Sequence, residues 1–150
     1  MTSSNSEPVQ KMDPDGSIHW YLNGQRHRDD GPAVVLANGS THWFRHGKRH
    51  RDDGPAITRE NGSSHWYQNG LLHREDGPAI IYSDGDRWWY YNGKLHREDG
   101  PAVQWKTGGG TWWINGVQYT EETFNAALMR FIRAQVDEKR RAGLKRKLLG

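Results

Sequence analysis

Four segments of this chain carry the residue types that acid–base or metal chemistry would need. Each reads His-Arg-x-Asp-Gly-Pro-Ala, and the four begin at His27, His50, His73 and His96. A histidine beside a carboxylate can move protons or bind a metal ion. The copies recur every 23 residues. In a stack of hairpins equivalent side chains would lie two strands, about 10 Å, apart, whereas one ion needs all its ligands at ~2.1 Å.

A metal ion shared between copies is therefore excluded. Because the motif is present in every copy, a structural role for it is favoured over a catalytic one. We predict that His and Asp satisfy loop backbone groups and that each Arg pairs with an Asp of its own or the next copy. The serines sit at predicted turns, and Gly108–Gly110 is in step with the other turn glycines rather than placed before a helix to hold phosphate. We predict no catalytic residue, no metal, no cofactor and no enzymatic activity.

The elements that position these segments follow from the same period. Glycines, tryptophans and Asn/Asp-Gly turn pairs all recur in step, which is typical of a repeat that buries its apolar face against its neighbours. We predict a mainly β fold, a single-sheet solenoid of 23-residue antiparallel hairpin repeats with a C-terminal capping α-helix. Residues 1–14 form an N-terminal arm or degenerate cap strand, 15–119 hold four full repeats and one partial repeat, and 120–150 form a helix and basic tail.

Composition narrows the class of protein. Only 33% of the 150 residues are hydrophobic, but eight Trp and six Tyr supply the burial that a thin sheet needs. The absence of cysteine fits a reducing compartment. No apolar run approaches the ~20 residues of a membrane span, and the first residues lack a signal-peptide core. We expect a soluble protein located in the cytoplasm, of the host cell if the protein is viral.

A two-residue turn at Asn38-Gly39 would set the register of the sheet. Val34 would then face Trp43, and Ala33 would face Phe44, and both pairings would return in later repeats. We predict that the face with Trp and Val/Ile is the core. The opposite face, with Ala, the aromatic column and His19, is expected to be the more accessible one.

The repeat resembles a known family. The run aromatic-x-x-Gly-x-x-His, as in 44–50 and 90–96, together with the period and the Asp-Gly turn, looks like MORN repeats, which are β-hairpin units that form a long twisted sheet. After the His, the chain has Arg-x-Asp-Gly-Pro-Ala where a MORN unit has Gly-x-Gly. This variant looks more like the Trp-Tyr-x-Asn-Gly-x-x-His-Arg-x-Asp-Gly-Pro-Ala repeats of bacteriophage and giant-virus proteins. The resemblance implies an interaction scaffold. It alone also implies that the protein is viral and that it inhibits a host protein, such as a defence protein.

The C-terminal region differs from the repeats. Thr120 is a predicted N-cap before Glu121 and Glu122. Phe124, Leu128 and Phe131 form one apolar stripe on a helix expected from about 121 to 141, which Gly143 weakens or ends. Eight Lys/Arg against four Asp/Glu in 120–150 account for the excess of positive charge. The basic tail comprises Lys139, Arg140, Arg141, Lys145, Arg146 and Lys147.

Two functions compete at this point. The first is a protein-binding module that uses one sheet face, with a host protein as the expected partner. The second is a nucleic-acid-binding protein that uses the basic tail and stacks bases on the aromatic/His face. A membrane surface is a less favoured partner for the tail. The tail could also have no partner and be simply solvated. The rings could instead serve only to pack against one another. The predicted partner-binding residues are Tyr21, Phe44, Tyr67, Tyr90, Trp113, His42, His65, Trp88, Arg45, Gln68 and Tyr91.

Specificity is expected at the two columns that vary between repeats. One holds Leu22, Arg45, Gln68 and Tyr91, and the other holds Leu36, Arg59, Tyr82 and Trp105. Nothing in the turn or strand pattern demands these particular side chains. A surface that selects one partner needs such positions, because residues repeated in every unit cannot distinguish one end of the strip from the other.

Overall fold

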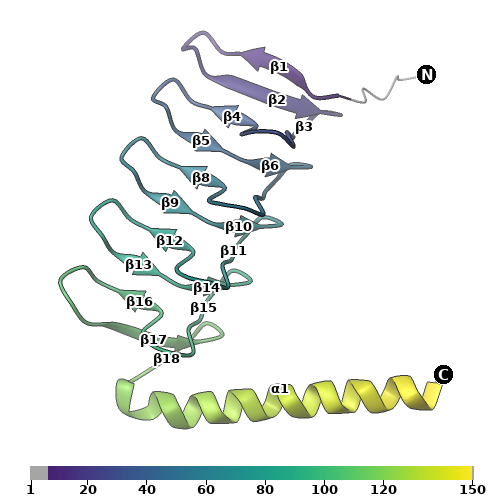
Figure 1. Ribbon diagram of the computed structural model, residues 1–150, viewed down its shortest axis with the longest axis vertical. Helices are drawn as coiled ribbons and strands as arrows, with labels where there is room; N and C mark the ends of the chain where they lie inside the picture. The colour runs from purple at the N-terminus through teal and green to yellow at the C-terminus, as the bar shows by residue number, and fades with distance from the viewer. Residues whose placement is uncertain (1–6, 150) are drawn as a thin grey trace.

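A computed structural model describes residues 7–149, and it shows one long antiparallel sheet with a single helix across its C-terminal end (Figure 1). The predicted fold class is confirmed. The first six residues of the predicted arm lie outside the described residues, but a strand at Val9–Met12 pairs with the first repeat as the predicted cap strand.

The main sheet has twelve strands, of which eleven follow one another in order along the stack and the twelfth, β3, pairs with β2. They are β1 (Val9–Met12), β2 (Ile18–Leu22), β3 (Gln25–Arg26), β4 (Val34–Val35), β5 (Thr41–His42), β8 (Ile57–Thr58), β9 (Ser64–His65), β12 (Ile80–Ile81), β13 (Arg87–Trp88), β16 (Val103–Gln104), β17 (Gly110–Ile114) and β18 (Val117–Tyr119).

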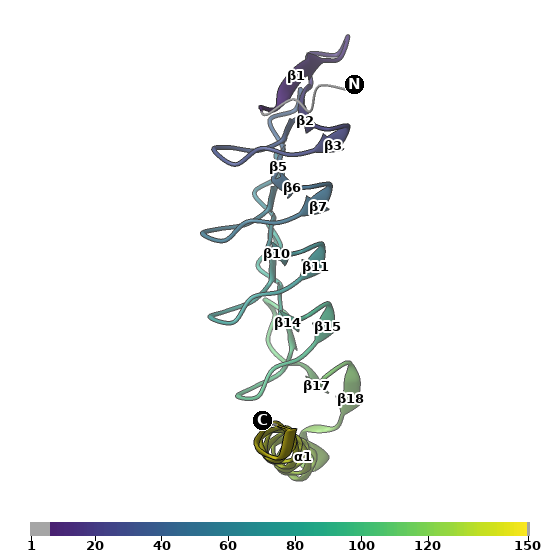
Figure 2. The same ribbon diagram turned by 90° about the vertical axis from the view of Figure 1, so that its right-hand side faces the viewer.

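A second, shorter hairpin follows the first in each middle repeat. These hairpins are β6 (Phe44–Arg45) with β7 (Lys48–Arg49), β10 (Tyr67–Gln68) with β11 (Leu71–Leu72), and β14 (Tyr90–Tyr91) with β15 (Lys94–Leu95). Their turns are two residues long, and Asn69 and Gly70 both have positive φ, 50° and 88°. Figure 2 shows these hairpins on one side of the stack and the Arg-x-Asp-Gly loops on the other.

The predicted register is wrong by one residue. Val34 pairs with His42, not with Trp43, because the first turn is a three-residue loop. The amide of Leu36 donates to the carbonyl of Ser40, and only Gly39 of the Asn-Gly pair has positive φ, 88°. The Asn38 side-chain oxygen instead accepts the amide of Ser40 at 3.0 Å, so Asn38 does not need the left-handed conformation of a two-residue turn.

This shift exchanges the partners on the two faces. Trp43 now lies opposite Ala33 across the strand pair, while Val34, His42 and Phe44 share the other face. The predicted Trp core is therefore wrong: the four Trp of 20, 43, 66 and 89 are half-buried. Phe44 and His65, expected on the accessible face, are each only 7% exposed.

Neighbouring repeats are held together at two recurring points besides the strand ladder. The hydroxyl of Ser17 accepts the amide of Ala37 at 3.0 Å, and Ser40 and Ser63 repeat this contact one unit further on. In the last copy the carboxylate of Asp86 takes the same place and accepts the amide of Lys106 at 2.9 Å. Each such bond satisfies a loop amide that would otherwise lack a partner.

Helix α1 (Glu121–Leu149) packs on β17 and β18 and takes the place of a fifth loop. The amide of Thr123 donates to the Thr120 hydroxyl, which confirms the predicted N-cap. Phe124 lies over Trp112, with ring centroids 4.7 Å apart, and packs on Ile114. The helix does not end near residue 141 as predicted but continues through Gly143 to Leu149, and its C-terminal half extends past the strands (Figure 1).

Candidate functional site

Each His of the four loops ties one repeat to the next. His50 Nδ1 accepts the backbone amide of Asn69 at 3.0 Å, and its Nε2 lies 2.9 Å from the Asp52 carboxylate. With Nδ1 as the acceptor, Nε2 is left to face the carboxylate, and Arg45 Nη1 also lies 2.8 Å from Nε2. The other three His accept the amides of His46, Asn92 and Asn115 in the same way. The prediction that the His satisfies a backbone group is confirmed, whereas the Asp of the motif bonds to the Arg side chain and not to a backbone group.

Each Arg of these loops is held within its own repeat. Arg51 Nε donates to Asp53 at 2.8 Å, and the guanidinium lies 4.1 Å from the Trp43 ring centroid. A Cβ on Gly54 would come within 3.0 Å of the Arg51 Cζ, so a side chain there would push against the guanidinium. The hydrogen bond and the charge of Arg51 lower the pKa of the Asp53 carboxyl. The same arrangement recurs at Arg28, Arg74 and Arg97.

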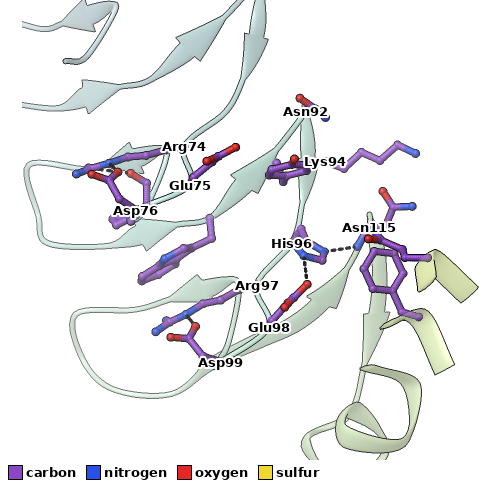
Figure 3. Close-up of a pocket in the computed structure, with 16 residues that line it drawn as sticks. Arg74, Glu75, Asp76, Asn92, Lys94, His96, Arg97, Glu98, Asp99 and Asn115 are labelled. Carbon is purple, nitrogen blue, oxygen red and sulfur yellow. Dashed lines mark hydrogen bonds and ion pairs between the residues drawn. The ribbon is translucent and has the colours of Figure 1, made fainter. Parts of the chain in front are cut away.

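The face that carries these loops and the half-buried Trp column is called the loop face. Pockets lie between successive loops, and the larger, about 1160 Å³, runs between the loops at 74–78 and 97–99 and reaches Phe131 of α1 (Figure 3). Figure 3 shows the Arg and Asp of each loop turned toward one another and His96 bonded to Asn115. Within residues 7–149 no three His, Cys, Asp or Glu side chains come together as a possible metal site.

The opposite face is called the aromatic face, and it is built from side chains that recur in columns. Strand pairing places each ring directly opposite a residue of the next strand, as for Tyr21 with Arg26 and Phe44 with Arg49, so both members of a pair point to the same side. The columns are His19, His42, His65 and Trp88; Val34, Ile57, Ile80 and Val103; Tyr21, Phe44, Tyr67, Tyr90 and Trp113; and Arg26, Arg49, Leu72, Leu95 and Gln118.

A further column borders this face. Leu36 packs against the buried Val34 and Phe44, and the Tyr82 ring meets Trp88 edge-on at 5.5 Å between centroids. The equivalent position is Arg59 in the repeat after Leu36 and Trp105 in the repeat after Tyr82. Trp105 is 42% exposed. Some neighbouring rings contact one another, as Trp88 and Tyr90 do with ring centroids 6.5 Å apart. The rings therefore pack against one another and also form a continuous surface.

Cations lie among the rings of the aromatic face. The guanidinium of Arg49 is 5.5 Å from the Phe44 ring centroid and 5.7 Å from that of Tyr67, and Lys11 lies 5.4 Å from Tyr21. Burial, and then the charges of nearby arginines, lower the pKa of both His42 and His65. The nearby arginine charges act in the same direction as burial, since like charges disfavour a protonated histidine.

The aromatic face also holds polar atoms without partners. Four buried side-chain nitrogens in the described part of the chain make no hydrogen bond: His19 Nδ1, Arg49 Nε, His65 Nε2 and Trp88 Nε1. All four side chains belong to columns of this one face. Buried polar groups are normally paired, so these four nitrogens are hydrogen-bonding capacity of this face that the described residues do not use.

The predicted site residues do not share one face. Three of them, Arg45, Gln68 and Tyr91, lie on the loop face. Arg45 donates to Asp52 at 2.8 Å, and Gln68 donates to the Arg51 carbonyl at 2.9 Å. The Tyr91 ring lies tilted against His73, with ring centroids 4.6 Å apart. The other eight lie on the aromatic face. Sequence reasoning left out Arg26 and Arg49, although their place opposite an aromatic residue across the second Asn-Gly or His-Gly turn would have identified them.

The six residues of the basic tail are exposed along the free part of α1. Within the described residues, no ion pair involves them. No helix in residues 7–149 has the length and apolar character needed to cross a bilayer.

Comparison with known proteins does not identify a family. No family model matches the chain, and no match is found among curated proteins. The likeness to MORN repeats therefore stays a prediction based on the repeat motif, whereas the repeating hairpins themselves are features of the structure.

Proposed function

We propose that the chain is a non-enzymatic protein-binding module whose partner lies on the aromatic face. The observation that carries this proposal is a row of rings that recurs in every repeat, lies on a single-layer sheet (Figure 2) and contains all four unpartnered buried nitrogens of the described residues. Rings and arginines of this kind supply most of the energy at protein interfaces. The loop His, Arg and Asp, by contrast, are occupied by structural contacts.

The finer part of the proposal rests on the repeat resemblance. It is that the protein is viral, acts in the cytoplasm of a host cell, and inhibits a host protein by occupying its surface. A long strip with one ring per repeat is better suited to cover the surface of another protein than to enclose a small molecule. The reason is that each repeat adds contact area in one direction only.

Capture from a nuclease-treated lysate tests the proposal with two matched variants. Tyr82→Glu places a charge on the aromatic face, and Tyr91→Glu places the same charge on the loop face of the same repeat. We expect wild-type protein and Tyr91→Glu to retain the same proteins and Tyr82→Glu to lose them, with circular dichroism verifying that both variants are folded. Loss of the proteins in Tyr91→Glu alone would move the partner to the loop face and refute the assignment.

A second candidate, nucleic-acid binding, is favoured by the six exposed basic residues on the projecting end of α1. If they neutralise phosphates, the slope of log affinity against log salt should reach up to ~5, at ~0.9 per duplex phosphate contacted. Changing all six to Gln would then abolish binding. For a partner on the sheet, the same variant should bind as wild type does, and affinity should depend only modestly on salt.

A further inference from the structure

The aromatic face is not uniform along the stack. Its cations lie before and within the first two repeats, at Lys11, Arg26, Arg49 and Arg59. Toward α1 the position of Arg26 and Arg49 is taken by Leu72, Leu95 and Gln118, and the position of Arg59 is taken by Tyr82 and Trp105. The first half of the face therefore combines cations with rings, and the half toward α1 carries rings and aliphatic side chains with no Lys or Arg in its columns.

The cations of the first half are not neutralised within the face. Near these cations lies the carboxylate of Asp13, which is 2.9 Å from His19 Nε2. The carboxylate of Asp86, opposite Tyr82, lies in the half toward α1 and accepts the Lys106 amide. Within residues 7–149 no ion pair involves the side chain of Arg26, Arg49 or Arg59. The Arg49 Nε is buried without a hydrogen bond. A ligand that covered this half would have to supply acceptors, because an unpaired buried guanidinium is strongly unfavourable.

We infer that the partner presents a segment with carboxylates where it crosses the first two repeats and with aromatic or aliphatic side chains where it crosses the last three. This inference rests on the proposed protein-binding function and specifies the chemistry of the partner. Adjacent repeats are two strands, about 10 Å, apart, so an extended segment of ~12 residues at ~3.3 Å each spans the five rows. Its acidic and apolar residues are segregated rather than alternating.

The same distribution argues against a nucleic acid on this face. A single strand carries a phosphate at every nucleotide, and grooves that bind it provide cations along their whole length beside the stacking rings. The aromatic face has rings along its whole length but Lys and Arg only in its first half. A protein segment can match such a division because its sequence can place charge at one end and apolar side chains at the other.

Titration of the whole protein with defined probes tests the inference. One probe is a twelve-residue peptide with Glu in one half and Leu and Trp in the other. The second has the same composition with the two kinds of residue alternating, the third has Lys in place of Glu, and the fourth is a dT12 oligonucleotide. We expect the segregated acidic peptide to bind at least about tenfold more tightly than any other probe, since complementary charge and apolar contact are satisfied together only in that peptide.

Two arginine variants locate the effect. Arg59→Glu, on the aromatic face, should weaken binding of the segregated peptide at least about tenfold, whereas Arg87→Glu, exposed on the opposite side of the sheet, should leave it unchanged. Preference for the oligonucleotide, equal binding of the two acidic peptides, or no binding by any peptide would overturn the inference. If lysate proteins are lost in Tyr82→Glu but retained in Arg59→Glu, the proposed function stands and the acidic partner is refuted.

Discussion

At the scale of single residues, the repeated motif consists of structural contacts. The His accepts a backbone amide of the next repeat, the Arg stacks on a Trp of its own repeat, and the Gly leaves room for that Arg. A structural role for the His and the Arg could be predicted from the sequence, because a residue type that recurs in every unit at one spacing most simply serves the contact that every unit makes, but the stacking of Arg on Trp and the role of the Gly were not predicted. The particular partners could not, since they depend on which loop faces which hairpin turn.

Replacing His50 tests this role. In His50→Ala the amide of Asn69 loses its acceptor, and we expect a destabilisation of about 1 kcal/mol or more, from the lost hydrogen bond and the lost packing of a ring that is 7% exposed. Glu60→Ala is the control, because that side chain is exposed and makes no hydrogen bond or ion pair in the described residues. Urea unfolding that gave equal losses for the two variants would contradict the assignment of His50 as a tie between repeats.

The histidines of the aromatic face predict an acid-sensitive fold. Burial and arginine charges lower the pKa of His42 and His65 below the usual 6.5. The unfolded chain therefore takes up protons first as the pH falls, and stability should decrease from about pH 6.5 downward. We expect the free energy of unfolding to drop between pH 7.5 and 5.5, and to drop less in His65→Gln. An equal drop in both proteins would show that His65 does not contribute.

At the scale of elements, the turns decide what sequence can and cannot predict. The pair Asn-Gly occurs at both Asn38 and Asn69, but it forms a three-residue loop at the first and a two-residue turn at the second. The difference arises from Ser40, whose amide bonds to the Asn38 side chain and whose hydroxyl serves the next repeat. The dipeptide alone gives no sign of this, so the existence of every hairpin was predicted correctly while the register, and with it both faces, was not.

Helix α1 was predicted in place and polarity but not in length. Its start follows from the Thr120 cap and the apolar stripe. A glycine inside a helix costs only about 1 kcal/mol relative to alanine, and a Cβ at Gly143 would meet nothing within 4 Å. The helix-forming residues around Gly143 therefore carry α1 through that position.

A pair of helix variants tests the capping role. Phe124 is 2% exposed, and Phe124→Ala should cost about 3–5 kcal/mol. Val136, 58% exposed on the same helix, should change stability by less than about 0.5 kcal/mol when replaced by Ala. Thermal or urea unfolding distinguishes the two, and an unchanged Phe124→Ala protein would mean that α1 is not a cap.

At the scale of the whole molecule, the two faces differ in character. The loop face carries exposed carboxylates, such as Asp76 and Asp99, each 82% exposed and paired with an arginine of its own loop. The aromatic face carries rings, cations and unpartnered nitrogens. The sequence alone could not assign these characters, because a one-residue error in register moves every side chain to the opposite face.

Site-specific photo-crosslinking tests the central claim most directly. A benzophenone amino acid replaces Trp105 on the aromatic face or Tyr91 on the loop face, two aromatic residues of similar exposure, 42% and 45%. Each protein is irradiated in a nuclease-treated lysate, and the attached proteins are identified by mass spectrometry. We predict that position 105 gives a discrete protein adduct and that position 91 gives none. An adduct from position 91 alone, or equal adducts from both positions, would contradict the assignment of the aromatic face as the docking surface.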